Sequence, residues 1–179
     1  MCIRDRPYSK TAKDYDAARE VLMKARPNVT RFSSSGYIND LAAGQLCVVM
    51  GYSGDINIAR QRAIETKSGH DIQALIPPTG ATLFFDTMAI PKDAKNVKNA
   101  HLFINYILRP EVHASLTNKV FYANPNAASK KFVKKEVAEN PTVFLSAEDL
   151  KKLTSPDAVP QDIRRVQTRI FTSFKANTK

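Results

Sequence analysis

Two short segments of the sequence each place an aromatic ring close to a carboxylate, at the end of an apolar run. The first is Gly51-Tyr52-Ser53-Gly54-Asp55, and the second, further along the chain, is Phe84-Phe85-Asp86. An aromatic ring attracts a cation through its quadrupole, and a carboxylate accepts hydrogen bonds from an ammonium group. Together the two segments predict a site for a ligand with two separated amines.

In the first segment, Asp55 follows a glycine where a helix is expected to begin. A carboxylate in the first turn complements the helix dipole, so helix capping is an alternative role for Asp55. For Tyr52 the alternative to ligand contact is a ring that packs at the end of a strand. Both roles of Asp55 are compatible, because the helix terminus also keeps the carboxylate ionised.

In the second segment, Phe84 and Asp86 are two residues apart on an expected strand. This spacing places both side chains on the same side of the strand, with Phe85 opposite. The alternative is a core phenylalanine beside a solvated or salt-bridged aspartate. An aspartate within an apolar strand is costly without a cationic partner, and this cost favours ligand contact.

No group of residues in the sequence predicts catalysis. Asp55 and Asp86 could form an acid/base pair, but no nucleophile, metal or oxyanion hole accompanies them. The three histidines lie apart, without the spacing of a zinc site or a catalytic triad. We therefore expect a protein that is not an enzyme, with no catalytic residue, no metal and no cofactor. Cys47 lies in an apolar run and is expected to be a small buried residue.

The net charge of +10 permits an anionic partner such as nucleic acid or a membrane surface. The basic residues gather late in the chain, however, where they fit the outer faces of expected helices. A solvated surface is therefore the preferred interpretation, and a basic nucleic-acid-binding module is the alternative function. No apolar run in the sequence is long enough to span a bilayer.

The pattern of apolar residues predicts the elements that must position these segments. Helical periodicity predicts helices over residues 14–24, 37–42, 55–67, 96–108, 111–119 and 161–175. Ser33, Ser34 and Ser35 offer N-caps for the second helix, and residues 146–149 resemble a capping box. Residues 28–32, 45–51, 71–76 and 81–90 are expected to be strands, and 45–51 is a strand buried on both faces. Strands that alternate with helices indicate an α/β fold.

Several longer motifs share a common order and spacing with one family. They are Arg26-Pro27-Asn28, Tyr37-Ile38-Asn39-Asp40-Leu41-Ala42, Ala89-Ile90-Pro91, Phe103-Ile104-Asn105-Tyr106-Ile107-Leu108-Arg109-Pro110 and Tyr122-Ala123-Asn124, together with the two segments above. From about Pro7 onward, the chain resembles the C-terminal half of bacterial periplasmic polyamine-binding proteins. These are the putrescine and spermidine receptors of ABC importers.

The resemblance implies a two-lobe, hinged type II periplasmic binding protein of which the N-terminal half is missing. Residues 1–6 show no periodicity and join abruptly to Pro7, so they are interpreted as a foreign or artefactual leader, and the resemblance makes residues 7–64 part of the second lobe. Residues 65–134 form the hinge crossing and part of the first lobe, and residues 135–179 are C-terminal helices that return to the second lobe. A chain that lacks half of its sheet is expected to expose apolar faces.

The resemblance also implies a ligand site. Asp55 matches an aspartate that takes a ligand amine, Tyr122 matches a pocket tyrosine, and Tyr52 stands where the family usually has tryptophan. The expected ligand-binding residues are Tyr52, Asp55, Phe84, Asp86 and Tyr122. Ser34 and Ser35 are weaker candidates, because helix capping explains them, and Met88 and Phe103 are expected in the core.

The function implied is extracytoplasmic capture of a linear polyamine, putrescine or spermidine, for ABC-type import. The expected partners are the polyamine and the membrane permease of the importer, with no nucleic acid. The resemblance also implies a periplasmic location, with a signal peptide outside this sequence, and a monomer when the protein is full length.

Overall fold

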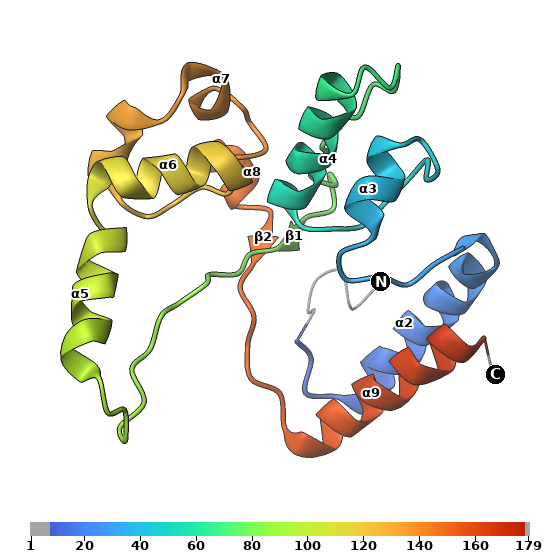
Figure 1. Ribbon diagram of the computed structural model, residues 1–179. Coiled ribbons are helices and arrows are strands. Elements are labelled where there is room, and N and C mark those ends of the chain that lie inside the picture. The colour runs from blue at the N-terminus through green and yellow to red at the C-terminus, as the bar shows by residue number, and fades with distance from the viewer. Residues whose placement is uncertain (1–7, 178–179) are drawn as a thin grey trace. The chain divides into compact units, whose positions relative to one another are not determined.

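The computed structural model describes residues 8–177, which form two compact units. Of the described residues, one unit combines 8–34, 78–84 and 152–177, and the other combines 35–77 and 85–151. Figure 1 shows the helices and strands with their labels. Each unit is described in turn.

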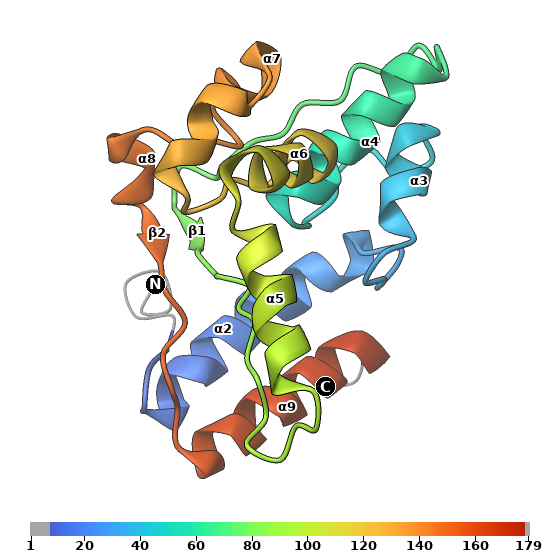
Figure 2. The ribbon, with the colours of Figure 1, turned by 60° about the vertical axis from the view of Figure 1, so that its left-hand side comes forward.

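The first unit is built on two long helices, α2 (Ala12–Ala25) and α9 (Gln161–Ala176), which lie side by side in Figures 1 and 2. Tyr15 of α2 packs with Ile163 and Ile170 of α9 in a buried cluster. These residues follow the periodicity of the sequence, so both predicted helices are confirmed. The two helices thus bury part of their apolar faces against each other, while Val21 of α2 and Phe171 of α9 remain exposed.

The chain after α2 packs on α9 and does not form the strand predicted over residues 28–32. A short 3₁₀ helix, η1 (Arg26–Asn28), follows α2 directly. The Arg26 Nε donates to the Phe174 carbonyl oxygen at 2.8 Å, and the guanidinium lies 5.4 Å from the Phe32 ring centroid. The Phe32 ring meets that of Phe174 edge to face at 5.3 Å. Residues 26–32 thus pack on α9 through side-chain contacts and do not pair as a strand.

The first unit also holds the two short strands of the described chain, β1 (Ala81–Thr82) and β2 (Leu153–Thr154), which pair in parallel. The pairing continues for one further bond, from the Leu83 N–H to the Thr154 carbonyl oxygen at 2.9 Å. Gly80 precedes β1 with φ +100°, and a Cβ there would collide with the Lys152 carbonyl oxygen. The strand predicted over residues 81–90 is therefore confirmed only at its start.

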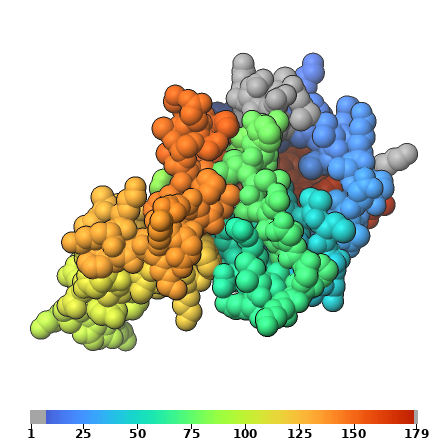
Figure 3. Space-filling view, turned by 90° about the horizontal axis from the view of Figure 1, so that it is seen from above, coloured from blue at the N-terminus to red at the C-terminus, as the bar shows by residue number. Residues whose placement is uncertain are grey.

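The second unit is helical. Its elements are α3 (Tyr37–Ala42), α4 (Ser53–Glu65), α5 (Val97–Ile107), α6 (Pro110–Val120), η2 (Ala127–Phe132), α7 (Lys135–Ala138) and α8 (Ala147–Leu150). One buried cluster joins α3 to α4 through Leu41, Ala59 and Ala63. In the space-filling view of Figure 3, α3 in cyan lies against α4 in blue-green. A second cluster joins α6 to α7 through Ala114 and Val137.

The ends of the helices show which residues of the sequence correctly predicted a helix boundary. Gly44 adopts φ +70° after α3, as expected of a helix-terminating glycine, and Ser146 Oγ accepts the Asp149 N–H at 3.1 Å to cap α8. The prediction that Ser33, Ser34 and Ser35 cap the second helix is wrong, because α3 has Gly36 at its N-cap position and no side-chain cap.

Residues 45–51 and 71–76 were predicted as strands and are irregular in the structure. Val48 is 90% exposed, Met50 is 99% exposed, and Cys47 is also exposed, so the expected burial of this run is wrong. A strand needs a neighbour for its backbone N–H and C=O groups. Within residues 8–177 no strand pairs with either segment.

Helix α5 confirms the predicted helix but not its burial. None of its residues is buried, and Phe103, which was expected in the core, is 59% exposed. Met88, in the extended segment before α5, was also expected in the core and is 49% exposed. The expectation of exposed apolar faces is thereby confirmed for these residues. No helix of the described chain is long and apolar enough to cross a membrane.

Candidate functional site

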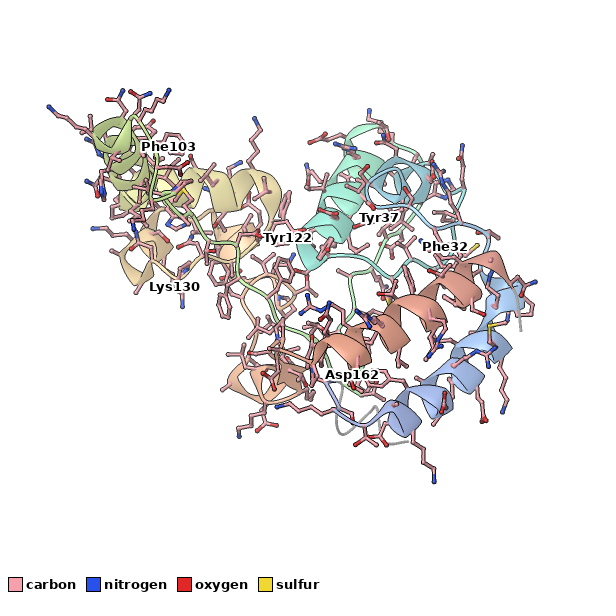
Figure 4. All side chains as sticks on the ribbon, turned by 90° about the horizontal axis from the view of Figure 1, so that it is seen from below. Phe32, Tyr37, Phe103, Tyr122, Lys130 and Asp162 are labelled. Carbon is pink, nitrogen blue, oxygen red and sulfur yellow. The ribbon has the colours of Figure 1, made fainter. Side chains whose placement is uncertain are left out.

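The candidate site centres on Asp55, a half-buried residue in the first turn of α4. Each oxygen of its carboxylate accepts one hydrogen bond from a tyrosine. The Tyr37 hydroxyl donates to Oδ2 at 2.5 Å, and the Tyr122 hydroxyl donates to Oδ1 at 2.9 Å. Figure 4 labels both tyrosines, which lie beside α4. All three residues belong to the second unit.

Tyr37 is held by the packing of α3 on α4. It is the first residue of α3, and its side chain is buried, with 6% of the residue exposed. Its ring lies against Gly51, where an added Cβ would come within 2.7 Å of the ring. Gly51 therefore gives the Tyr37 ring room to lie against the backbone that leads into α4.

Tyr122 reaches Asp55 from the end of α6. The helix ends at Phe121, which adopts a left-handed conformation with φ 57°, and Tyr122 follows in an irregular segment. Its ring lies against Gly54, where an added Cβ would overlap the ring. Glycine inside a helix destabilises it by about 0.5–1 kcal/mol relative to alanine. The space required by the Tyr122 ring accounts for glycine at this position.

A buried network fixes the segment that carries Tyr122. The Asn124 side chain donates to Thr117 Oγ1 at 2.8 Å and accepts from Ser129 Oγ at 2.8 Å. Its Oδ1 also accepts the Asn126 N–H at 3.0 Å. Thr117 and Ser129 are each 2% exposed, so these polar groups need protein partners. The network ties the Tyr122 segment to α6 and η2.

A second network fixes the start of α4. Asn57 is 3% exposed, and its Nδ2 donates to the Ser53 carbonyl oxygen and to Thr142 Oγ1, both at 2.9 Å. Its Oδ1 accepts from Asn140 Nδ2 at 3.0 Å. The first turns of α4, and Asp55 with them, are thus bound to residues 140–142. Nothing in the sequence alone singled out these amides.

Two causes, burial first and the hydrogen bond to Asp55 second, make the hydroxyls of Tyr37 and Tyr122 harder to ionise. Together they raise the pKa of Tyr37 to about 12 and the pKa of Tyr122 well above its usual range. Both phenols therefore stay protonated at neutral pH and remain donors. An ionised carboxylate offers about four acceptor positions, and the phenols use two of them. The two phenols thus do not use all the acceptor positions of the Asp55 carboxylate.

Tyr52, predicted as an aromatic ligand contact, is the N-cap residue of α4 and is 53% exposed. Its backbone N–H donates to the Tyr37 hydroxyl at 3.4 Å, a long hydrogen bond. The structure therefore brings together three of the predicted residues, Tyr52, Asp55 and Tyr122. It adds Tyr37, which the sequence placed in an expected helix and in a family motif but not among the ligand-binding residues.

Phe84 and Asp86 do not belong to the hydrogen-bonded group at Asp55. Phe84 lies in the first unit and is 39% exposed, and Asp86 lies in the second unit and is exposed. Residues 84–86 are not a strand, so the predicted placement of both side chains on one side of a strand is wrong. Within residues 8–177 the Asp86 carboxylate has no hydrogen bond or ion pair. A ligand role for both residues stays a prediction.

Ser34 and Ser35, the weaker candidates, are exposed, and they belong to different units. The Ser35 carbonyl oxygen accepts the Ile38 N–H at 3.3 Å. A ligand role for these serines also stays a prediction. Among residues 8–177, no group of three or more His, Cys, Asp or Glu could hold a metal ion.

Comparison with known proteins agrees with the resemblance read from the sequence. The chain matches the profile of bacterial extracellular solute-binding proteins over residues 7–153. It is 45% identical over 171 residues to the putrescine-binding periplasmic protein PotF of Escherichia coli, which covers 95% of this chain and 46% of that protein. It is 43% identical over 172 residues to the putrescine-binding periplasmic protein SpuD of Pseudomonas aeruginosa, which covers 96% of this chain and 47% of that protein.

Solved structures give the same result. A structure assigned to a spermidine/putrescine ABC transporter of Listeria monocytogenes matches with a TM-score of 0.81 and 31% identity, covering 94% of this chain and 50% of that one. The spermidine/putrescine ABC transporter substrate-binding protein PotD of Streptococcus pneumoniae matches with a TM-score of 0.74 and 25% identity, covering 96% of this chain and 51% of that one.

The chain thus spans about half the length of the curated relatives it matches. These relatives are solute-binding proteins by name, and none of the comparisons supports the nucleic-acid-binding alternative. The family match covers most of the sequence, and the structural matches have the α/β, type II binding-protein fold. The chain therefore belongs to the bacterial extracellular solute-binding proteins, with the α/β type II fold of its structural matches.

Proposed function

We propose that this chain supplies part of the polyamine site of an extracytoplasmic solute-binding protein. The complete protein would capture putrescine or spermidine in the periplasm and deliver it to the permease of an ABC importer. The observation that carries the proposal is the Asp55 carboxylate, which two neutral phenols hold at the start of α4. The relatives that are named for putrescine binding support the class of ligand.

At this site the ligand ammonium donates its N–H groups to the acceptor positions of Asp55 that the phenols leave open. Charge-assisted bonds of this type are about twice as strong as neutral ones. The neighbouring tyrosine rings favour the cation through their quadrupoles. No proton transfer or bond cleavage is required, so the arrangement suits reversible binding.

The second amine would meet Asp86, and the Phe84 ring would lie against the methylene chain. A desolvated ammonium without acceptors loses about 1–3 kcal/mol per unmade bond, or more because the group is charged. A diamine of unsuitable length would leave such groups unpaired, and this would give selectivity for length.

Capture would be coupled to closure of two lobes. The family resemblance divides the lobes into residues 7–64 and 135–179 on one side and residues 65–134 on the other, whereas the two compact units of the structure divide the chain at other positions. A ligand that binds the closed arrangement more tightly than the open one shifts the population toward closure. The closed, loaded form would be the one that the permease recognises.

The test is Asp55→Asn in the full-length protein, with putrescine and spermidine binding measured by calorimetry. The substitution keeps the size of the side chain and removes its charge. We expect affinity to fall at least tenfold, or about 1.4 kcal/mol. Asp93→Asn, at an exposed turn between β1 and α5, is the matched control and should bind as the wild type does. An unchanged affinity in Asp55→Asn would overturn the proposal.

A further inference from the structure

We propose that Tyr37 is a positioning residue of the ligand site, which holds the Asp55 carboxylate and the Tyr52 backbone in one fixed arrangement. The inference rests on the proposed function, because it assigns Tyr37 a role in the same site. Tyr37 would act on the ligand only through Asp55 and Tyr52.

The direction of the hydrogen bonds around the Tyr37 hydroxyl is determined by chemistry. The Tyr52 backbone N–H can only donate, so the Tyr37 oxygen accepts this bond, at 3.4 Å. The single phenolic proton then donates to Asp55 Oδ2. The Tyr37 hydroxyl oxygen therefore connects the Tyr52 backbone to the Asp55 carboxylate.

The burial of Tyr37 distinguishes it from Tyr122. Tyr37 is 6% exposed and lies on α3, whose packing on α4 uses the cluster of Leu41, Ala59 and Ala63. Tyr122 is half-buried and lies in the irregular segment after α6. A ligand can thus approach the exposed side of Tyr122, whereas the buried Tyr37 supports Asp55 from behind.

Both hydrogen-bond partners of the Asp55 carboxylate are neutral phenols, and within residues 8–177 Asp55 forms no ion pair. An arginine or lysine in their place would orient the carboxylate but compete with a cationic ligand for its charge. Phenols orient the carboxylate and leave the charge in place. A carboxylate that is already ordered also loses less conformational entropy when the ligand binds.

The experiment uses Tyr37→Phe in the full-length protein, with putrescine binding measured by calorimetry and folding checked by circular dichroism and thermal melting. We expect binding to weaken about five- to twentyfold, near the lower limit for one hydrogen bond to a charged group, because Tyr122 still donates to the other carboxylate oxygen. Tyr106→Phe is the matched control: Tyr106 is 50% exposed on α5, and its ring contacts Arg109. This control removes a phenolic hydroxyl outside the site and should leave binding unchanged.

A double-mutant cycle separates positioning from a general structural role. If Tyr37 acts through Asp55, Tyr37→Phe should change binding by less than about twofold when Asp55→Asn is already present. Equal losses in both backgrounds would overturn the inference. So would wild-type affinity in Tyr37→Phe beside a large loss in Asp55→Asn, a result that would leave the proposed function standing. Unchanged affinity in Asp55→Asn would instead reject the proposed site itself.

Gly51→Ala keeps the proposal falsifiable if Tyr37→Phe does not fold. The added Cβ would lie 2.7–2.9 Å from the Tyr37 ring and hydroxyl, so it must displace the hydroxyl without removing it. Weaker putrescine binding in a folded Gly51→Ala protein is the expected result. Wild-type affinity for this variant would overturn the positioning role.

Discussion

The two predicted carboxylates, Asp55 and Asp86, lie in very different surroundings. Asp55 is half-buried at a helix start and accepts bonds from two tyrosines, whereas Asp86 is exposed in an extended segment. The surroundings of Asp55 are complete within one unit, because α3, α4 and the end of α6 all contribute. The comparison teaches that one of the two predicted carboxylates is oriented by side chains of its own unit, whereas the other is not.

The comparison predicts unequal losses when each charge is removed. In the full-length protein, Asp55→Asn should weaken putrescine binding about a hundredfold and Asp86→Asn about tenfold, within the 1.5–3 kcal/mol of a charge-assisted bond. The larger loss is expected at Asp55 because its carboxylate is already oriented. Calorimetry of both variants side by side is the measurement, and an equal or reversed order would break the comparison.

The next prediction concerns the room that Gly54 leaves for Tyr122. Gly54→Ala places a Cβ in the Tyr122 ring, so the ring must move away from Asp55. We expect about tenfold weaker putrescine binding and a loss of about 1–3 kcal/mol in stability from overpacking. Ser53→Ala, an exposed position in the same turn, is the control and should preserve both quantities. Undiminished binding by Gly54→Ala would show that the position of the Tyr122 ring does not matter.

A smaller effect on binding is expected when the Asn57 side chain is removed, because its hydrogen bonds support α4 and none of them reaches the Asp55 carboxylate. Asn57→Ala leaves the Asn140 amide and the Thr142 hydroxyl without one partner each. The free energy of unfolding should fall by about 1–3 kcal/mol, the cost of unsatisfied buried groups. Urea unfolding measures this loss. A normal stability together with lost binding would instead place Asn57 in the ligand site.

The smallest effect is a change in stability at high pH. The pKa of Tyr37 is raised in the folded protein to about 12, from about 10 in an unfolded chain. The stabilisation is therefore complete below pH 10 and is lost as the pH rises toward 12. Urea unfolding without ligand at pH 9, 10 and 11 should show this decline. Tyr37→Phe should reduce it, and an identical decline in that variant would contradict the assignment.

The sequence predicted the helices better than the strands, and the reason is physical. The periodicity of Ile163, Ile170 and Phe174 is a local signal, and α9 forms as expected. The run that contains Val48 and Met50 needs a partner strand from elsewhere in a chain, and residues 8–177 provide none. The family resemblance identified Asp55 and Tyr122, and the structure places them in contact.

Tyr37 illustrates what sequence reasoning missed. An apolar pattern assigns it to a helix face, and its burial agrees with that assignment. Its contact with Asp55 depends on the packing of α3 against α4, which local periodicity does not specify. A signal was nevertheless present, because Tyr37 and Asp55 both belong to motifs that the sequence shares with the family. Gly51 was expected at the end of a strand and Gly54 just before a helix, whereas in the structure they lie against the rings of Tyr37 and Tyr122.

The neutral phenols around Asp55 also have a consequence for release of the ligand. When an ammonium group leaves a buried carboxylate, the anion usually needs a replacement counter-ion or a full shell of water. At the proposed site Tyr37 and Tyr122 would still donate to the half-buried anion after departure, which would reduce the need for a replacement cation. A carrier built on this site could therefore discharge its cargo without waiting for another cation to take its place.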